Sequence, residues 1–151
     1  MTDNQFYAKE WLNRMYNLAL RIESLEAKRE TILASLSGVG KYEIDSFPGS
    51  SGDNPTETKN IEFSILSQKI DEESNRLAEE DIRTQAVIDC LGDSKDERLM
   101  KAILTYRYSL RWGWKAIAEQ IHYSESRTRD YHLLALEAIY KFIPEECIYE
   151  N

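Results

Sequence analysis

The chain opens with a long stretch of helix-compatible sequence, residues 5–36, which constrains the fold more than any other feature. It contains neither glycine nor proline, and its apolar residues recur at the three- and four-residue spacing of a heptad seam. The residues of the seam are Met15, Leu18, Ile22, Leu25, Ile32 and Leu36. Such a helix extends about 48 Å at ~1.5 Å per residue. A compact core alone cannot bury so long a stripe, so we expect the seam to need a partner.

A second helix-compatible stretch offers a partner within the same chain. Residues 37–58 hold four of the six glycines and two of the three prolines, a composition that predicts a loop. Residues 57–91 are then expected to form a helix whose apolar positions are Phe63, Leu66, Ile70 and Leu77. Pairing of the two helices gives an antiparallel, coiled-coil-like hairpin. The residues leave open whether the seam closes within one chain or between two copies.

The sequence after the hairpin carries signals for shorter helices. Ser94 and Glu97 match a capping box that opens a third helix, expected to run to about Leu110. No segment alternates apolar and polar residues over a convincing length, as a half-buried strand would. We therefore expect an all-α fold, with a helical hairpin arm over residues 1–92 and a second domain over residues 93–151.

Two short amphipathic helices separated by a tight turn are expected within residues 112–143. The first covers residues 114–121, and Ser124 is a good N-cap for the second, which Pro144 ends. Two helices joined by so short a turn cross steeply, and the crossing requires a small residue where they touch, a position that Ala118 fits. This is the pattern of a helix-turn-helix, whose second helix enters the major groove of DNA by its N-terminal residues.

The net charge of −8 argues against nucleic-acid binding unless the charge is unevenly distributed. Residues 98–132 carry seven Lys and Arg against three Asp and Glu, whereas residues 1–97 carry 11 against 20 and residues 133–151 carry one against four. A basic segment inside an acidic chain is the electrostatic footprint expected of a DNA-binding face. A solvated surface without a specific function is an equally ordinary origin for it.

Several short motifs follow one another in this basic segment. They are Arg107-Tyr108, then Trp114-Lys115-Ala116-Ile117-Ala118, then Tyr123-Ser124 with Arg127 and Arg129, and finally Ala135-Leu136. The series resembles region 4 of bacterial sigma factors. The whole chain is similar to small phage-encoded regulators, the late-transcription activators of the ArpU and RinA kind. The resemblance implies a helical N-terminal region before a sigma-region-4-like helix-turn-helix domain, with DNA and host RNA polymerase as partners.

The resemblance also implies roles for individual residues. Glu125, Ser126 and Arg129 take the positions that contact base edges, in agreement with their chemistry, because Arg bonds guanine O6 and N7 and Glu accepts from cytosine N4. Phosphate contacts are assigned to Arg107, Arg111, Lys115 and Arg127. Solvated surface charge is the alternative role for each of these side chains.

The chain departs from the family pattern at three points. Glu125 stands where a basic residue is usual, which changes the expected base preference. His122 occupies a turn position where glycine is common, although histidine tolerates a left-handed backbone better than branched residues do. No part of the chain resembles region 2 of sigma factors. We therefore expect an activator or partial mimic and not a complete sigma factor.

Leu133 and Leu134 add apolar surface to the second helix of the pair. Packing against the third helix or the arm is one expectation for them. Contact with a second subunit is the other, because helix-turn-helix proteins commonly bind paired half-sites as dimers. Together with the heptad seam, the two leucines form the candidate surface for a homodimer or another partner.

Other kinds of site find little support in the sequence. His122 and His132 with Cys90 and Cys147 match no standard zinc-ligand spacing, and no nucleophile or phosphate-loop signature is present. We expect no metal, no cofactor, no small-molecule substrate and no enzyme activity. No apolar run approaches the roughly 18 residues that span a bilayer, and the first residues do not read as a secretory signal. The expected location is the cytoplasm, that of the bacterial host for a phage protein.

The leading hypothesis from the sequence is a sequence-specific regulator of transcription that binds double-stranded DNA. In this hypothesis it is a phage late-gene activator working with host RNA polymerase, and its acidic arm dimerises it or docks it on the polymerase. The alternative is a protein-interaction module that uses the same fold to bind polymerase or a repressor without DNA. The acidic net charge and Glu125 favour the alternative.

Overall fold

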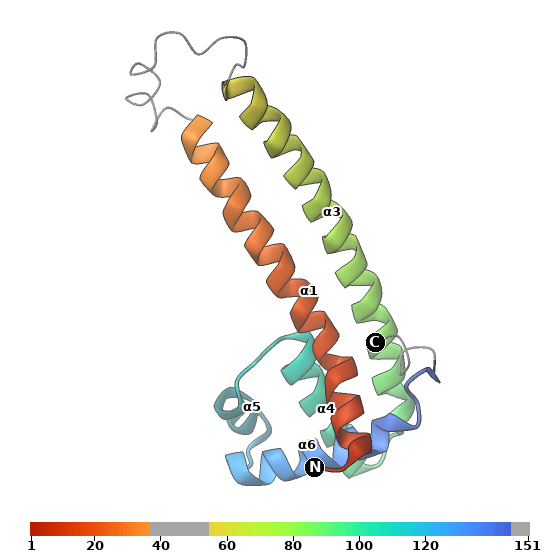
Figure 1. Ribbon diagram of the computed structural model, residues 1–151. Coiled ribbons are helices and arrows are strands. Elements are labelled where there is room, and N and C mark those ends of the chain that lie inside the picture. The colour runs from red at the N-terminus through yellow and green to blue at the C-terminus, as the bar shows by residue number, and fades with distance from the viewer. Residues whose placement is uncertain (37–54, 146–151) are drawn as a thin grey trace. The chain divides into compact units, whose positions relative to one another are not determined.

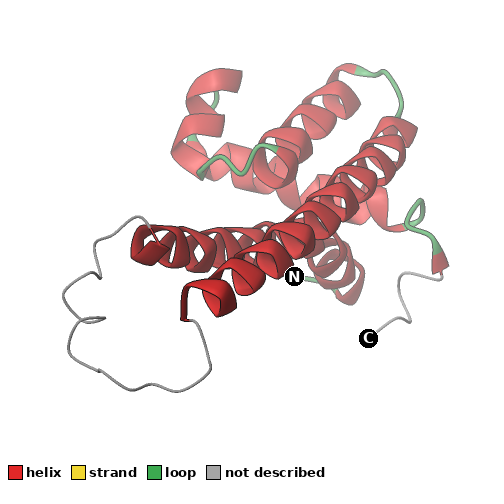
Figure 2. Cartoon of the chain, turned by 90° about the horizontal axis from the view of Figure 1, so that it is seen from above, coloured by secondary structure: helices red, strands yellow, loops and turns green. Residues whose placement is uncertain are grey.

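Helices account for the regular structure of residues 1–36 and 55–145, the part of the chain that this computed structural model describes. In chain order they are α1 (Asp3–Ala34), α3 (Pro55–Ile88), a 3₁₀ turn (Asp89–Leu91), α4 (Lys95–Leu104), a π-helical turn (Thr105–Ser109), α5 (Trp114–Ile121) and α6 (Glu125–Tyr140) (Figure 1). The described residues form no strand (Figure 2). The expectation of an all-α chain is confirmed for them.

The helix ends correct the predicted boundaries in two places. The expected loop over residues 37–58 is too long, because α3 already begins at Pro55. Proline suits the first turn of a helix, where its missing N–H has no intrahelical partner to lose. Residues 37–54 lie outside the described part of the chain. The third helix is α-helical only to Leu104, and a π-helical turn carries it on to Ser109.

The start of α4 is the capping box that the sequence predicts. The Ser94 hydroxyl accepts from the Glu97 backbone N–H at 3.2 Å, and the Glu97 carboxylate accepts from the Ser94 N–H at 3.2 Å. The hydroxyl of Ser94 and then its backbone N–H, both beside the Glu97 carboxylate, lower the pKa of that group. The two hydrogen bonds of the capping box satisfy donors that the first turn of a helix would otherwise leave unpaired.

The chain packs as two compact units that do not follow the sequence-based division at residues 92 and 93. The first unit contains Met1–Asn17 and Leu77–Asn151, and the second contains Leu18–Arg76. The helices α1 and α3 each contribute to both units. The division into an arm of residues 1–92 and a domain of residues 93–151 stays a prediction about independent folding.

In the second unit, the end of α1 and the beginning of α3 pack side by side with opposite chain directions (Figure 1). Lys28 Nζ lies 3.9 Å from the Glu62 carboxylate, and Arg29 donates to the Ser67 hydroxyl at 3.4 Å. The apolar residues buried in this unit are Ala19, Ile22, Leu25, Ile32, Leu66 and Ile70. Leu18 and Leu36, the other predicted seam residues here, are half-buried. Most of the seam in this unit is therefore covered within a single chain.

In the described part of the first unit, the beginning of α1 and the residues from α6 to Ile143 share a buried core. Its buried cluster consists of Ala8, Trp11, Leu12, Met15, Val87, Ile88, Leu91, Leu104, Tyr108, Ala135, Leu136, Ile139 and Ile143. Met15, a predicted seam residue, thus packs in this core. At its edge Arg14 forms a 2.8 Å ion pair with Glu80 and donates to the buried Thr84 hydroxyl at 2.9 Å. The N-terminus is fixed to α6, because Thr2 donates to Glu137 at 2.7 Å and Gln5 donates to the Leu133 carbonyl at 3.0 Å.

Two leucines of α6 allow a matched test of this core. Leu136 is fully buried in the cluster, whereas Leu134 on the same helix is 57% exposed. Replacing Leu136 with Ala removes buried contacts and leaves a cavity, so we expect the free energy of unfolding to fall by about 2–5 kcal/mol. Leu134→Ala should change it by less than about 0.5 kcal/mol. Urea denaturation followed by circular dichroism measures both. Equal losses in the two variants would contradict the packing of α6.

Candidate nucleic-acid interface

The segment from α5 to α6 is built by local hydrogen bonds that its sequence specifies. The helix α5 ends at His122, which has the left-handed conformation φ 63°, ψ 40°. The Ala118 carbonyl accepts from the N–H groups of both His122 and Tyr123. Because these bonds close the C-terminal turn of α5, the chain leaves the helix abruptly. His122 takes the place that glycine usually holds.

The helix α6 starts one residue after this turn, at the N-cap that the sequence predicts. The Ser124 hydroxyl accepts from the Arg127 N–H at 3.1 Å. The Thr128 hydroxyl donates to the Ser124 carbonyl at 2.8 Å, and Thr128 itself is fully buried. Ala118, on the facing helix, is also buried. Each helix thus has a small buried residue close to the turn, as a short connection between crossing helices requires.

The first turns of α6 expose a row of charged and polar side chains. Glu125, Ser126 and Arg129, assigned to base edges from the sequence, are all exposed, and so are Arg127 and Asp130. Within the described residues, neither Arg127 nor Arg129 forms an ion pair. Both guanidinium groups are therefore accessible to a ligand. Their contact with DNA stays a prediction.

Aromatic rings, and not carboxylates, contact these two arginines. The Arg127 guanidinium carbon lies 5.0 Å from the centre of the Tyr131 ring, and that of Arg129 lies 5.8 Å from the centre of the Trp114 ring. A guanidinium over an aromatic face gains about 0.5–1 kcal/mol at an exposed site. The contact orders the side chain without neutralising its charge. An arginine held in this way remains able to bind an anion.

Trp114 contacts a second arginine as well. The Arg107 guanidinium lies 4.6 Å from the centre of the indole ring and donates to the Trp112 carbonyl at 3.0 Å. Arg107, predicted to bind phosphate, therefore also has a structural role in the connection before α5. The contact of Trp114 with two arginines was not predicted from the sequence. Its position at the start of α5 beside Lys115 gave no signal of this, because Arg129 lies on another helix.

The other two predicted phosphate contacts, Arg111 and Lys115, are both exposed. Arg111 has φ 60°, a left-handed conformation that costs energy for a residue with a side chain. It follows the π-helical turn, where Leu110 N–H bonds the Thr105 carbonyl at 3.1 Å. The chain therefore reverses sharply at Arg111 on its way from α4 to α5.

A buried polar pair links α6 to the π-helical turn beneath this surface. The Tyr108 hydroxyl and His132 Nε2 share a hydrogen bond of 2.7 Å, and both residues are buried. The Trp114 ring meets the His132 ring edge-on, with centroids 4.6 Å apart. Burial lowers the pKa of His132 to about 4, helped by the charges of Arg107 and Lys9, and burial raises the pKa of Tyr108. His132 is therefore neutral near pH 7.

His132 was not predicted to be buried, although its spacing in the helix indicates this. It lies four residues after Thr128 and four before Leu136, both fully buried, so helical periodicity places it on the buried stripe. Tyr131, the neighbour of His132, is half-buried.

The two leucines assigned to a partner surface have different environments. Leu133 packs against the core of the first unit, and its carbonyl accepts from Gln5. Leu134 is exposed. Leu133 therefore packs within its own chain, the first of the two expectations, and Leu134 remains available for a partner.

Comparison of the chain with protein-family models, with curated proteins and with solved structures gives no match. No helix in the described ranges is both long enough and apolar enough to cross a membrane. Residues 1–36 and 55–145 contain no group of three or more His, Cys, Asp or Glu side chains that could hold a metal ion. Cys147, one of the zinc ligands considered from the sequence, lies outside the described residues.

The buried His132 makes stability depend on pH. In the unfolded chain its pKa is near 6.5, and in the folded chain it is about 4, so between these values the unfolded state binds more protons. The stability contributed by the neutral ring is complete above pH 6.5 and is lost as the pH falls towards 4, by about 3 kcal/mol in total. Urea denaturation at a series of pH values measures the loss.

Two variants separate this effect from the titration of carboxylates. His132→Gln removes the titrating ring and should flatten the pH dependence between 4 and 6.5, even if the variant is less stable throughout. His122→Gln changes an exposed histidine and should retain the wild-type dependence. If the free energy of unfolding of His132→Gln changes with pH in parallel with that of wild type, the His132 ring is not the source of the pH dependence.

Proposed function

We propose that the chain is a helix-turn-helix protein that binds double-stranded DNA and regulates transcription. The observation that carries the proposal is the first two turns of α6, where Arg127 and Arg129 are exposed, free of ion pairs among the described residues, and held against aromatic rings. Pre-ordered cationic side chains at the start of the second helix suit insertion into a major groove. The N-terminal turn of α6 is the proposed reading element.

Each exposed side chain of this turn has a chemically suitable partner on DNA. Arg129 donates to guanine O6 and N7, Glu125 accepts from cytosine N4, and Ser126 serves as donor or acceptor. Arg127, with Arg107, Arg111 and Lys115, binds backbone phosphates, which position the protein on the duplex without reading sequence. Affinity should fall steeply with salt, because these cations displace counterions from the phosphates.

The acidic balance of the whole chain is compatible with this proposal. The excess of Lys and Arg lies in residues 98–132, and the excess of Asp and Glu lies outside them. Repulsion from the acidic segments weakens non-specific association, so the contribution of base contacts to binding becomes proportionally larger.

The finer proposal is a phage-encoded regulator with a sigma-region-4-like domain preceded by a helical hairpin. Such a regulator acts in the host cytoplasm, as a late-gene activator working with host RNA polymerase. Because most of the heptad seam is buried within one chain, a homodimer or a polymerase contact would use other surface, and Leu134 on α6 is exposed for that purpose.

The second candidate function is a protein-interaction module that does not bind DNA. The carboxylates of Glu125 and Asp130, exposed beside the two arginines, favour it, because they repel phosphate. Copurification from host cells separates the two functions. A complex with polymerase or a repressor that survives nuclease treatment supports this second function, whereas loss of the complex on nuclease treatment supports the first.

Arg127→Ala and Arg129→Ala test the DNA-binding proposal. Both side chains are exposed, so the variants should fold and melt like wild type. We expect Arg129→Ala to weaken binding to a DNA fragment selected from the source genome by about 1–3 kcal/mol and to relax base preference. Arg127→Ala should weaken binding to all sequences alike.

The matched control for both variants is Arg76→Ala, which removes one exposed cation from the second unit. Gel-shift titrations at fixed salt compare the three variants with wild type. If Arg127→Ala and Arg129→Ala retain DNA as well as Arg76→Ala does, the proposed mechanism is wrong.

A further inference from the structure

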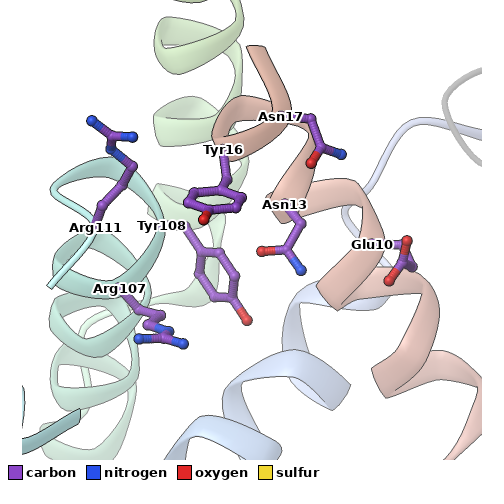
Figure 3. Close-up of a pocket in the computed structure, with 7 residues that line it drawn as sticks. All are labelled: Glu10, Asn13, Tyr16, Asn17, Arg107, Tyr108 and Arg111. Atoms are coloured by element: carbon purple, nitrogen blue, oxygen red, sulfur yellow. The ribbon is translucent and has the colours of Figure 1, made fainter. Parts of the chain in front are cut away.

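A groove lies in the first unit between the beginning of α1 and the segment around the π-helical turn (Figure 3). Its lining residues are Glu10, Asn13, Tyr16, Asn17, Arg107, Tyr108 and Arg111. The cavity volume is about 540 Å³, within the range of small-ligand sites. Neither the proposed base contacts nor the core requires such a space.

The two walls of the groove offer different hydrogen-bond donors. Arg107 and Arg111 lie on one wall, and Asn13 and Asn17 lie one helical turn apart on α1 (Figure 3). Within the described residues, the side-chain amides of Asn13 and Asn17 have no hydrogen-bond partner. Tyr108 contributes its ring, because its hydroxyl is engaged with His132. The site therefore combines cationic donors with unused neutral donors.

The charge of the lining favours an anion. The lining holds two arginines, Arg107 and Arg111, and one carboxylate, that of Glu10 on α1 (Figure 3). Guanidinium groups bind phosphate through paired, charge-assisted hydrogen bonds, and amide groups can donate to the remaining oxygens.

One aromatic ring, that of Trp114, contacts both a groove residue and a residue of the proposed reading surface. Arg107 lines the groove and lies over the Trp114 ring, and Arg129 of α6 contacts the same ring. A DNA strand whose bases contact the start of α6 would place its phosphate backbone along Arg129 and Arg107. Lys115, exposed beside Trp114, extends this line of cations.

We propose that the groove binds a phosphate group of the DNA backbone, with Asn13 and Asn17 of α1 completing a site begun by Arg107 and Arg111. The choice of DNA as the source rests on the proposed function. A free nucleotide offers the same phosphate chemistry, and the experiment below distinguishes the two sources. The beginning of α1 thereby becomes part of the DNA-binding surface.

Asn17→Asp and Asn13→Asp test the proposal with nearly isosteric changes that place a negative charge in the groove. Each should weaken binding of the full chain to duplex DNA about tenfold and make the plot of log K against log salt less steep by about one. Glu10→Gln should tighten binding about twofold, because it removes the opposing carboxylate. Melting temperatures establish that the variants fold.

The matched control is Asn75→Asp, the same substitution at an exposed position of the second unit. It should leave both the affinity and the salt slope unchanged. A parallel titration with ATP, followed by tyrosine and tryptophan fluorescence, tests the free-nucleotide source.

Each outcome decides whether the groove binds phosphate, and none of them can be confused with a failure of DNA binding by α6. Weaker DNA binding by Asn13→Asp and Asn17→Asp, but not by Asn75→Asp, supports the proposal. Loss of ATP binding with unchanged DNA binding supports a phosphate groove and overturns DNA as its source. If both variants bind DNA and ATP as wild type does, the proposal that the groove binds phosphate is wrong. If Arg129→Ala still loses affinity for DNA in that case, the proposed function stands without the groove.

Discussion

The hydrogen bond between His132 and Tyr108 is the contact on which the arrangement around α6 depends. It joins two buried polar groups from separate elements, and each would be costly to bury without the other. Trp114 packs its ring against His132 and thereby brings the start of α5 to the same point. The π-helical turn, α5 and α6 therefore share one polar contact at their centre. The direction of α6 follows from that contact as much as from the tight turn before it.

The aromatic rings around this centre also determine how the surface presents its charge. Trp114 is inward-facing towards His132 and at the same time provides a face for Arg107 and Arg129. The buried polar pair thus fixes the ring, and the ring orders the cations. Neutral His132 matters for the same reason, because a charged imidazolium beneath Arg107 would repel it. In this way the interior sets the geometry of the proposed DNA-binding surface without contributing any atom to it.

Features with a local cause could be predicted from the sequence, and features with a distant partner could not. The capping box at Ser94, the left-handed His122 and the N-cap Ser124 each depend on residues within five positions of one another, and all three are present. By contrast, nothing in the sequence around Glu80 predicts the ion pair that it forms. Its partner Arg14 is 66 residues away, and no spacing rule connects them. The roles of the candidate arginines of α6 came from the resemblance to sigma region 4, whereas nothing in the sequence indicated the rings that contact them.

The packing of the first unit explains why sequence order is a poor guide to this surface. Ala8, Leu12 and Met15 of α1 are buried together with Leu136 and Ile139 of α6, so the first helix is part of the core that supports the last one. The same stretch of α1 turns Asn13 and Asn17 towards the groove that Arg107 and Arg111 line. A helix with one face in the core has its opposite residues held in place by that core. The proposed DNA-binding surface is therefore composite, because the packing that stabilises α6 also positions the polar face of α1 at the groove beside the π-helical turn.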